Sequence, residues 1–193
     1  MHNSAVKVAL APPESPLTDG IIALRVPSRA DIDALVEYAE RPSGLDVTWL
    51  PVVPGAPYER LRWVVEDWIK GWAGLESFNG PALLLTVPDT SRFVGQVGFG
   101  SRGSDVVELV YGVAPEQRGR GLATRAVVLA TSWLLRDRGV REVELRIGRA
   151  HRESQRVAEK AGFRLSGSVR DVVNGTGETF DDLRYVCDLK PLT

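Results

Sequence analysis

Two arginines and two glycines alternate at residues 118–121, in the order Arg118-Gly119-Arg120-Gly121. An apolar run typical of a buried strand precedes them, and a long amphipathic pattern typical of a helix follows. A turn in that place leaves backbone N–H groups unpaired at the positive end of a helix. The glycines let a ligand approach the backbone closely, and the arginines add positive charge. This stretch therefore predicts a cradle for a diphosphate.

Other motifs of nucleotide and hydrolase chemistry lack support. The segment Gly98–Gly103 matches G-x-G-x-x-G, but a second strand follows it where a dinucleotide site requires a helix. We interpret it as a glycine-rich hairpin. The sequence has no G-K-[ST] phosphate loop and no G-x-S-x-G elbow, so the NTPase and serine hydrolase classes are not indicated.

Composition narrows the class of protein further. The 193 residues carry a net charge of −1, which gives no global reason to expect a nucleic acid or an anionic membrane as partner. The single cysteine, Cys187, excludes an internal disulfide framework and a cysteine-based metal cluster, and we expect no metal site. No apolar run reaches the length of a membrane span, and no signal peptide is evident, so we expect a cytoplasmic protein.

The elements that position the turn follow from periodicity and turn residues. Residues 1–19 contain three prolines and predict a tail, loose or docked, within a single domain that spans 1–193. Strands are predicted at 21–26, 82–87, 92–99, 106–113, 142–147, 169–173 and 183–189, and helices at 32–39, 58–72, 122–137 and 154–161. The aromatic stripe of the second helix, with Trp68 and Trp72, is interpreted as core. This order of elements is that of an α+β sheet with a β-turn-α-β unit at its centre.

The turn and a segment downstream of it together resemble the GCN5-related N-acetyltransferase (GNAT) superfamily. Residues 118–123 fit the [QR]-x-x-G-x-[GA] signature and lie between a strand and a helix, as that family requires. Residues 151–163, HRESQRVAEKAGF, are similar to the "N-x-x-S … A-x-K-x-G-F" segment of the Rim-type (RimJ/RimL-like) branch, which includes ribosomal-protein N-terminal acetyltransferases. The resemblance covers residues 21–189 in element order and is most specific from 106 to 167.

The resemblance implies a fold, a cofactor and a set of binding residues. The fold is a mixed, mostly antiparallel sheet of about six or seven strands flanked by about four helices. The sheet splays where the pantetheine of acetyl-CoA inserts beside residues 106–113. The implied contacts to coenzyme A come from Tyr111, Gly112, Val113, Arg118, Gly119, Arg120, Gly121, Leu122, Ala123 and Thr124, and the N–H of Val113 would polarise the thioester carbonyl. His151 stands where the family usually has Asn, as a cofactor contact or as an ordinary surface residue.

The implied activity is direct acetyl transfer to a primary amine, without a covalent enzyme intermediate. Glu108 interrupts an apolar strand, lies on the face of Val110 and matches the Glu of "E-[IL]-G-Y" in Rim-type enzymes, so it is our candidate base. Its alternative is an edge-strand charge that faces solvent. Ser154 is our candidate donor to the leaving sulfur, and its alternative is a plain helix N-cap.

The acceptor and the assembly stay open at this level. The acceptor is a protein N-terminal amine or a small-molecule amine, selected by residues 43–80 with Trp49 and by the Asn174-Gly175 hairpin. An acidic patch at Glu178, Asp181 and Asp182 either serves a cationic substrate or is a solvated loop. A homodimer is a mild expectation from the family. The competing class is a non-catalytic acyl-CoA-binding module, which would keep residues 118–124 and would not need Glu108.

Overall fold

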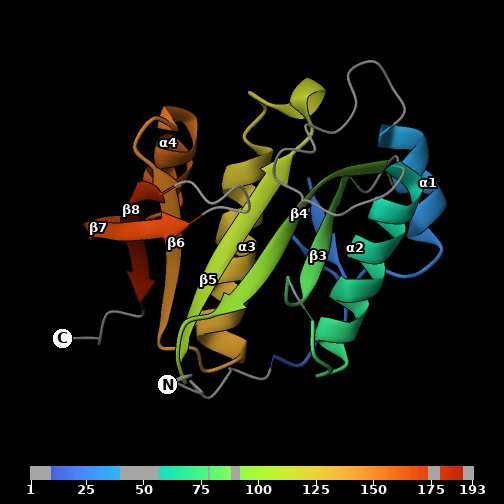
Figure 1. Cartoon of the computed structure of the whole chain (residues 1–193), viewed down its shortest axis with the longest axis horizontal. Helices are drawn as coiled ribbons and strands as arrows, with labels where there is room; N and C mark the ends of the chain where they lie inside the picture. Colours follow the sequence, from blue (N-terminus) through green and yellow to red (C-terminus); the bar gives the residue numbers. More distant parts are fainter. Residues whose placement is uncertain (1–9, 40–56, 78, 88–91, 174–178, 189–193) are drawn as a thin grey trace.

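A computed structural model describes residues 10–39, 57–77, 79–87, 92–173 and 179–188. One eight-stranded mixed sheet runs through it in the order β1-β2-β3-β4-β5-β6-β8-β7, with helices against both of its faces (Figure 1). The strands are β1 Leu17–Thr18, β2 Ala23–Arg25, β3 Ala82–Val87, β4 Arg92–Ser101, β5 Val106–Val113, β6 Glu142–Gly148, β7 Arg164–Val173 and β8 Thr179–Asp188. The helices are α1 Asp31–Ala39, α2 Pro57–Trp72, α3 Leu122–Asp137 and α4 Arg152–Lys160, with a short 3₁₀ helix, η2, at Pro115–Gln117.

The α+β class is confirmed, but the expected strand count is wrong. The additional strand, β1, lies inside the segment that the sequence predicts to be a loose or docked tail. It pairs with β2 through Leu17↔Leu24 and Thr18↔Ala23. The Asp19 carboxylate closes the connection by accepting the N–H groups of Ile21 and Ile22 at 2.9 and 3.0 Å. Two paired residues produce no periodicity, so the pattern of the sequence gives no sign of this strand.

Two apolar cores lie on opposite faces of the sheet. Helices α3 and α4 pack with one face of β3 to β6, and α1 and α2 pack with the other face of β3 and β4. Four successive residues of β3, Ala82–Leu85, are fully buried because this central strand is covered on both sides. In Figure 1, α3 lies behind β5 at the centre of the view, and α1 and α2 stand at its right. The half of the sheet formed by β5, β6 and β8 therefore has α3 and α4 on one face, and no helix of the described residues packs on its other face.

The aromatic stripe of α2 is buried, as predicted for Trp68 and Trp72, but Trp68 lies in the core shared with α1 and Trp72 in the core shared with α3. Trp72 packs edge to face on Phe99 and Trp133, with ring centroids 5.6 and 6.2 Å away. Its indole N–H donates to the carbonyl of Ala82 at 2.7 Å. The trio joins the C-terminal end of α2 to β4 and α3, and so fixes the helix against the sheet.

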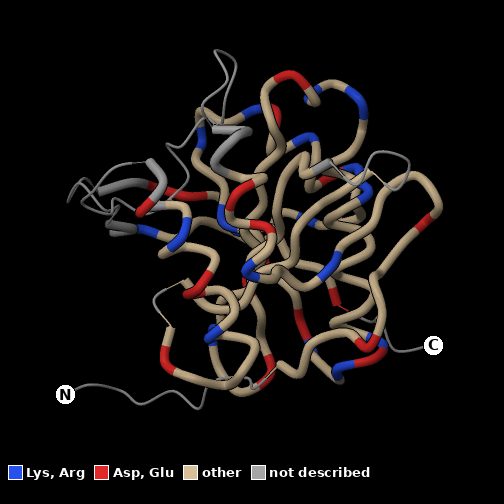
Figure 2. The backbone as a smooth tube through the Cα atoms, turned by 90° about the vertical axis from the view of Figure 1, so that its right-hand side faces the viewer, with Lys and Arg blue, Asp and Glu red and all other residues tan. Residues whose placement is uncertain are grey.

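Charges on the described chain are mixed in sign. Figure 2 shows Lys and Arg positions interspersed with Asp and Glu positions along the backbone, in keeping with the net charge of −1. At the start of α1, Asp31 reaches back to accept the Ser28 N–H at 2.7 Å and also pairs with Arg25. Such pairs connect neighbouring elements without producing a face of one charge.

Candidate active site

Strands β5 and β6 run parallel and pair over only three residues. Their register extends from Val106↔Glu142 to Glu108↔Glu144. Beyond Glu108 the two strands diverge, which leaves residues 109–113 of β5 without a strand on that side in the described part of the chain (Figure 1). The splay predicted at this strand is therefore present, and Glu108 lies at its apex.

The direction of the β5 backbone groups decides which residues face this gap. The N–H of Ala114 donates to the carbonyl of Val94 at 2.9 Å. Because hydrogen-bonded pairs alternate in an antiparallel ladder, residues 108, 110 and 112 direct their backbone groups to β4. Tyr111 and Val113 direct theirs into the gap, as expected, and Leu109 does so as well. Gly112 does not suit the role that the resemblance implies, because its backbone groups point to β4.

The turn after β5 has the geometry of an anion cradle. Gly119 and Gly121 have φ of 76° and 75°, a conformation that L residues rarely adopt. α3 begins at Leu122, and its first backbone bond runs from the Arg125 N–H to the Gly121 carbonyl at 3.1 Å. The N–H groups of residues 119–124 have no acceptor among the residues that the structure describes, and Gly121 offers no side-chain cap. The space is open, since a Cβ at either glycine would meet no atom within 4 Å.

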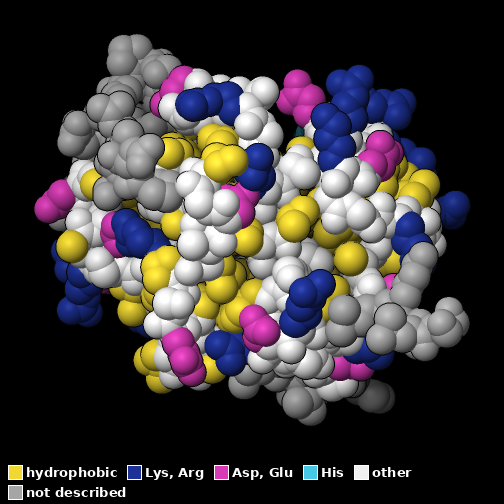
Figure 3. Space-filling view, turned by 180° about the vertical axis from the view of Figure 1, so that it is seen from behind, with side chains coloured by type: hydrophobic (Ala, Val, Ile, Leu, Met, Phe, Trp, Pro, Cys, Tyr) yellow, Lys and Arg dark blue, Asp and Glu magenta, His cyan; other side chains and the backbone are white. Residues whose placement is uncertain are grey.

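Basic side chains flank this turn. Arg118 lies at the surface and donates from Nε to the carbonyl of Val113 at 3.1 Å, which secures the end of β5. Arg120 pairs with the side chain of Gln117. Figure 3 shows, from behind, Lys and Arg side chains over this turn and over α4, with a notch between the two. The open N–H groups and this positive charge fit the diphosphate of coenzyme A.

A tyrosine bridges the gap from β5 to α4. The Tyr111 hydroxyl donates to the backbone carbonyl of Ser154 at 3.4 Å. Burial raises the pKa of Tyr111, although the hydrogen bond with Ser154 offsets part of that effect, so the hydroxyl keeps its proton at neutral pH. The interpretation of Ser154 as an N-cap is wrong, because α4 begins two residues earlier than predicted and His151 occupies the N-cap position. The His151 side chain is exposed and makes no capping hydrogen bond.

Glu108 is not a solvent-facing edge charge. It lies on an internal strand, opposite Gly100 of β4, and its side chain is 11 % exposed. Its carboxylate forms an ion pair with Arg102, from the turn between β4 and β5. Val110, on the same face one step further into the splay, is 49 % exposed. The face therefore presents a largely buried carboxylate next to an accessible apolar position.

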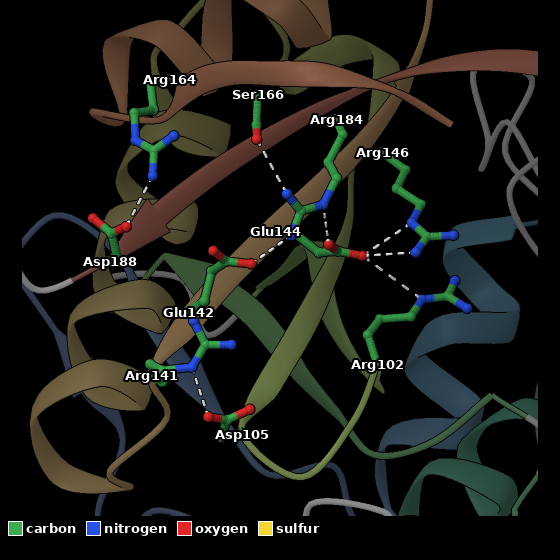
Figure 4. Close-up of polar contacts among 10 residues, drawn as sticks. All are labelled: Arg102, Asp105, Arg141, Glu142, Glu144, Arg146, Arg164, Ser166, Arg184 and Asp188. Atoms are coloured by element: carbon green, nitrogen blue, oxygen red, sulfur yellow. Dashed lines mark hydrogen bonds and ion pairs between the residues drawn. The ribbon is translucent and has the colours of Figure 1, made fainter. Parts of the chain in front are cut away.

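A second carboxylate, Glu144 of β6, lies beside Glu108 and was not anticipated from the sequence. Its side chain is 2 % exposed and accepts from Arg146 at 2.9 Å and from Arg184 of β8 at 2.6 Å. Figure 4 shows these arginines and Arg102 converging on Glu144. The signal was present in part, because polar residues at 142, 144 and 146 alternate with the apolar ones of β6. No local pattern could have supplied the partners from β8 and from the β4–β5 turn.

The remaining candidates contribute no further reactive centre. A cavity of about 600 Å³ at the other end of the sheet is lined by uncharged residues, among them Trp72, Phe99 and Val107. In the described residues no three His, Cys, Asp or Glu side chains group as a metal site would require. No helix among them has the length and apolar character needed to cross a membrane.

The residues predicted to select the acceptor are only partly described. Asp181 is exposed, whereas Glu178, Trp49 and the Asn174-Gly175 turn lie outside the described residues.

Comparison with known proteins places this geometry in a family. The model of the acetyltransferase (GNAT) domain matches residues 22–164, which is most of the chain. The chain belongs to the GNAT acetyltransferases. Among curated proteins no sequence matches it significantly. The expected acetyl-CoA-dependent N-acetyltransferase class is thereby confirmed at the level of the family.

Solved structures of GNAT acetyltransferases share the fold at low sequence identity. A ribosomal-protein-S5-alanine acetyltransferase from Vibrio fischeri superposes with a TM-score of 0.73 at 14 % identity, over 91 % of this chain and 97 % of its own. RimJ from Mycobacterium smegmatis, in complex with CoA-disulfide, gives 0.72 at 20 % identity, over 90 % and 86 %. A GCN5-related N-acetyltransferase from Brucella melitensis gives 0.74 at 18 % identity, over 97 % and 84 %. These likenesses confirm the GNAT fold for this chain.

Proposed function

We propose that this enzyme transfers the acetyl group of acetyl-CoA to a primary amine that is bound on the Glu108 face of β5. The observation that carries the proposal is the fork between β5 and β6. Glu108 lies at its apex, and the open N–H groups of residues 119–124 lie beyond its wide end. A carboxylate and an anion cradle at the two ends of one gap suit a long cofactor whose reactive group must meet an amine.

The residues proposed to hold the cofactor follow from this arrangement. Backbone groups of Tyr111 and Val113 would pair with the pantetheine arm, and N–H groups from Gly119 to Thr124 would bind the diphosphate. Arg118 and Arg120 would add charge at the mouth of the cradle. His151, the exposed N-cap residue of α4, is proposed as a further cofactor contact, because it stands where the family usually has Asn.

Acetyl transfer from an ammonium ion removes two protons from the nitrogen and adds one to the sulfur. When bound, the thioester would supply an electrophilic carbonyl carbon, to which the amine nitrogen bonds as the carbon–sulfur bond breaks. Amines with a pKa of about 8 to 10 are mostly protonated at neutral pH, so one proton must leave before the nitrogen can attack, and a second leaves as the amide forms. Glu108 takes the two protons in turn; one passes to solvent and the other ends on the departing sulfur. The Val113 N–H donates to the carbonyl oxygen, and Ser154 donates a hydrogen bond to the departing sulfur.

The acceptor proposed for the first trial is the N-terminal amine of a protein. Two solved structures with this fold are named for such acceptors, a ribosomal-protein-S5-alanine acetyltransferase and a ribosomal L7/L12 α-N-protein acetyltransferase. A small-molecule amine remains the other acceptor class. The expectations of a cytoplasmic enzyme and of a homodimer rest on the sequence and the resemblance alone.

An amine panel tests this function. Thiol release from acetyl-CoA is measured with N-terminal peptides, polyamines, amino acids and aminoglycosides, and the acetylated product is identified by mass spectrometry. Turnover with at least one primary amine is expected. If acetyl-CoA binds and no amine of the panel supports turnover, the enzyme proposal fails and a non-catalytic acyl-CoA-binding module replaces it.

A further inference from the structure

Arg102 occupies the one carboxylate that the proposed reaction requires. The residue follows β4, and its N–H donates to the Val106 carbonyl at 2.9 Å, which fixes the backbone of the turn. The side chain folds back over the face of the sheet and pairs with Glu108. Gly100, directly across from Glu108, leaves room there, since a Cβ at Gly100 would lie 3.9 Å from that of Glu108.

The neighbouring carboxylate, Glu144, already pairs with two other arginines. Both oxygens of Glu144 accept from arginines, Oε1 from Arg146 and Oε2 from Arg184. Arg102 is 3.9 Å from Glu144 Oε1, a far looser contact than its pair with Glu108. The guanidinium is therefore assigned to Glu108, and Glu144 contributes only a weak second attraction (Figure 4).

Arg102 is also the member of this cluster best able to leave. Its side chain is 43 % exposed, against 22 % for Arg146 and 29 % for Arg184. A guanidinium keeps its proton under all physiological conditions, so Glu108 cannot exchange a proton with it. An incoming ammonium group carries the same charge and can also donate charge-assisted hydrogen bonds to a carboxylate, although it lacks the planar fork of a guanidinium.

We propose that, in the free enzyme, the Arg102 guanidinium occupies the position on Glu108 that the ammonium group of the acceptor takes when it binds. It holds Glu108 in the free enzyme and yields that carboxylate when a cationic primary amine binds. This inference rests on the proposed function, because it takes Glu108 as the site of the amine. It adds that the acceptor competes with a guanidinium of the chain itself for the Glu108 carboxylate. Acceptors with a charged amine can displace Arg102, whereas neutral aromatic amines gain nothing from the exchange.

The test is the response of the amine KM to removal of Arg102. In the variant Arg102→Ala, the KM for an alkylamine should fall about two- to five-fold at saturating acetyl-CoA, the range set by a partly exposed ion pair. The KM for a neutral arylamine should stay unchanged, and Arg102→Lys should stay near wild type. The control is Arg141→Ala, which removes an arginine paired with Asp105 at the same end of the sheet, without contact to Glu108.

A guanidinium ion added in solution gives a second readout. Methylguanidinium at millimolar concentration should inhibit Arg102→Ala competitively against the amine, more strongly than wild type or Arg141→Ala. Calorimetry without acetyl-CoA should show methylguanidinium binding to Arg102→Ala and not to the double variant Arg102→Ala/Glu108→Gln.

Two results would overturn the proposal. One is an unchanged or raised amine KM in Arg102→Ala with kcat lowered, which would make Arg102 an ordinary support of Glu108. The other is equal inhibition of wild type and variant by methylguanidinium. Failure of the proposed function can be told apart from failure of this inference, because the binding of methylguanidinium measured by calorimetry does not depend on turnover.

Discussion

Alanine at Gly119 or Gly121 should weaken acetyl-CoA binding through backbone strain. Both glycines have positive φ, and a Cβ at either would meet no atom within 4 Å. The penalty is therefore conformational and not steric, at about 1–2 kcal/mol for an L residue in the left-handed region. The free protein can relieve that strain by moving the turn, which redirects the N–H groups of residues 119–124. Restoring the cradle on binding then costs the same energy, so affinity should fall about 5- to 30-fold.

Gly139→Ala is the matched control for these two variants. Gly139 has φ of 65°, is equally free of neighbours, and follows the other end of α3. Thermal unfolding shows how much of the strain each free variant retains, whereas only the first two variants should lose affinity in a titration with acetyl-CoA. Equal affinities for all three variants would refute the assignment of the cradle to this turn, and an equal loss in all three would show a general effect of destabilisation.

Two further predictions concern stability. Burial alone would raise the pKa of Asp31, but hydrogen bonds from Arg25 and Ser28 outweigh it and hold that pKa below its ordinary value. The carboxylate therefore contributes stability above its unfolded pKa of about 4 and loses it as the pH falls through the folded pKa. In urea unfolding, Asp31→Asn should be less stable than wild type at neutral pH, and the difference should shrink in acid; a difference that grows in acid would contradict this. Trp72→Ala should cost about 3–5 kcal/mol in the same assay, because it removes a buried indole and its bond to Ala82, and a loss below ~1 kcal/mol would mean that the aromatic trio does not hold α2.

The parts of the fold that the sequence predicts well are those with sustained periodicity. The limits of α3, Leu122–Asp137, are the ones expected, because one apolar face and Gly139 mark them. Strand β7 is longer than predicted, since register shifts between Leu165 and Gly167 and between Val169 and Val172 interrupt its alternation. Strand β8 is also longer, because it pairs with β7 back to Thr179. β1 escaped prediction because its two residues form a strand only through pairing with β2.

The candidate site, like the fold, has parts that the sequence predicts and parts that it does not. The turn at 118–121 could be predicted because a local motif specifies it, and the splay beside β5 was implied by the resemblance to the GNAT family. Which residues of β5 direct their backbone groups into the gap, Gly112 or its neighbours, depends on the register between β4 and β5, and only the structure supplies that register. The ion pair of Glu108 with Arg102 and the buried Glu144 join four elements, and no spacing along the chain encodes such contacts.

The most direct test of the central claim is the rate of amide formation in Glu108→Gln. Glutamine keeps the size of the side chain and cannot accept the proton that the amine nitrogen must lose. With acetyl-CoA saturating in both enzymes, a single-turnover experiment should show amide formation slowed by ~10²–10⁴-fold while acetyl-CoA affinity stays at the wild-type level. A Glu108→Gln enzyme that forms the amide as fast as wild type would contradict the assignment of Glu108 as the base.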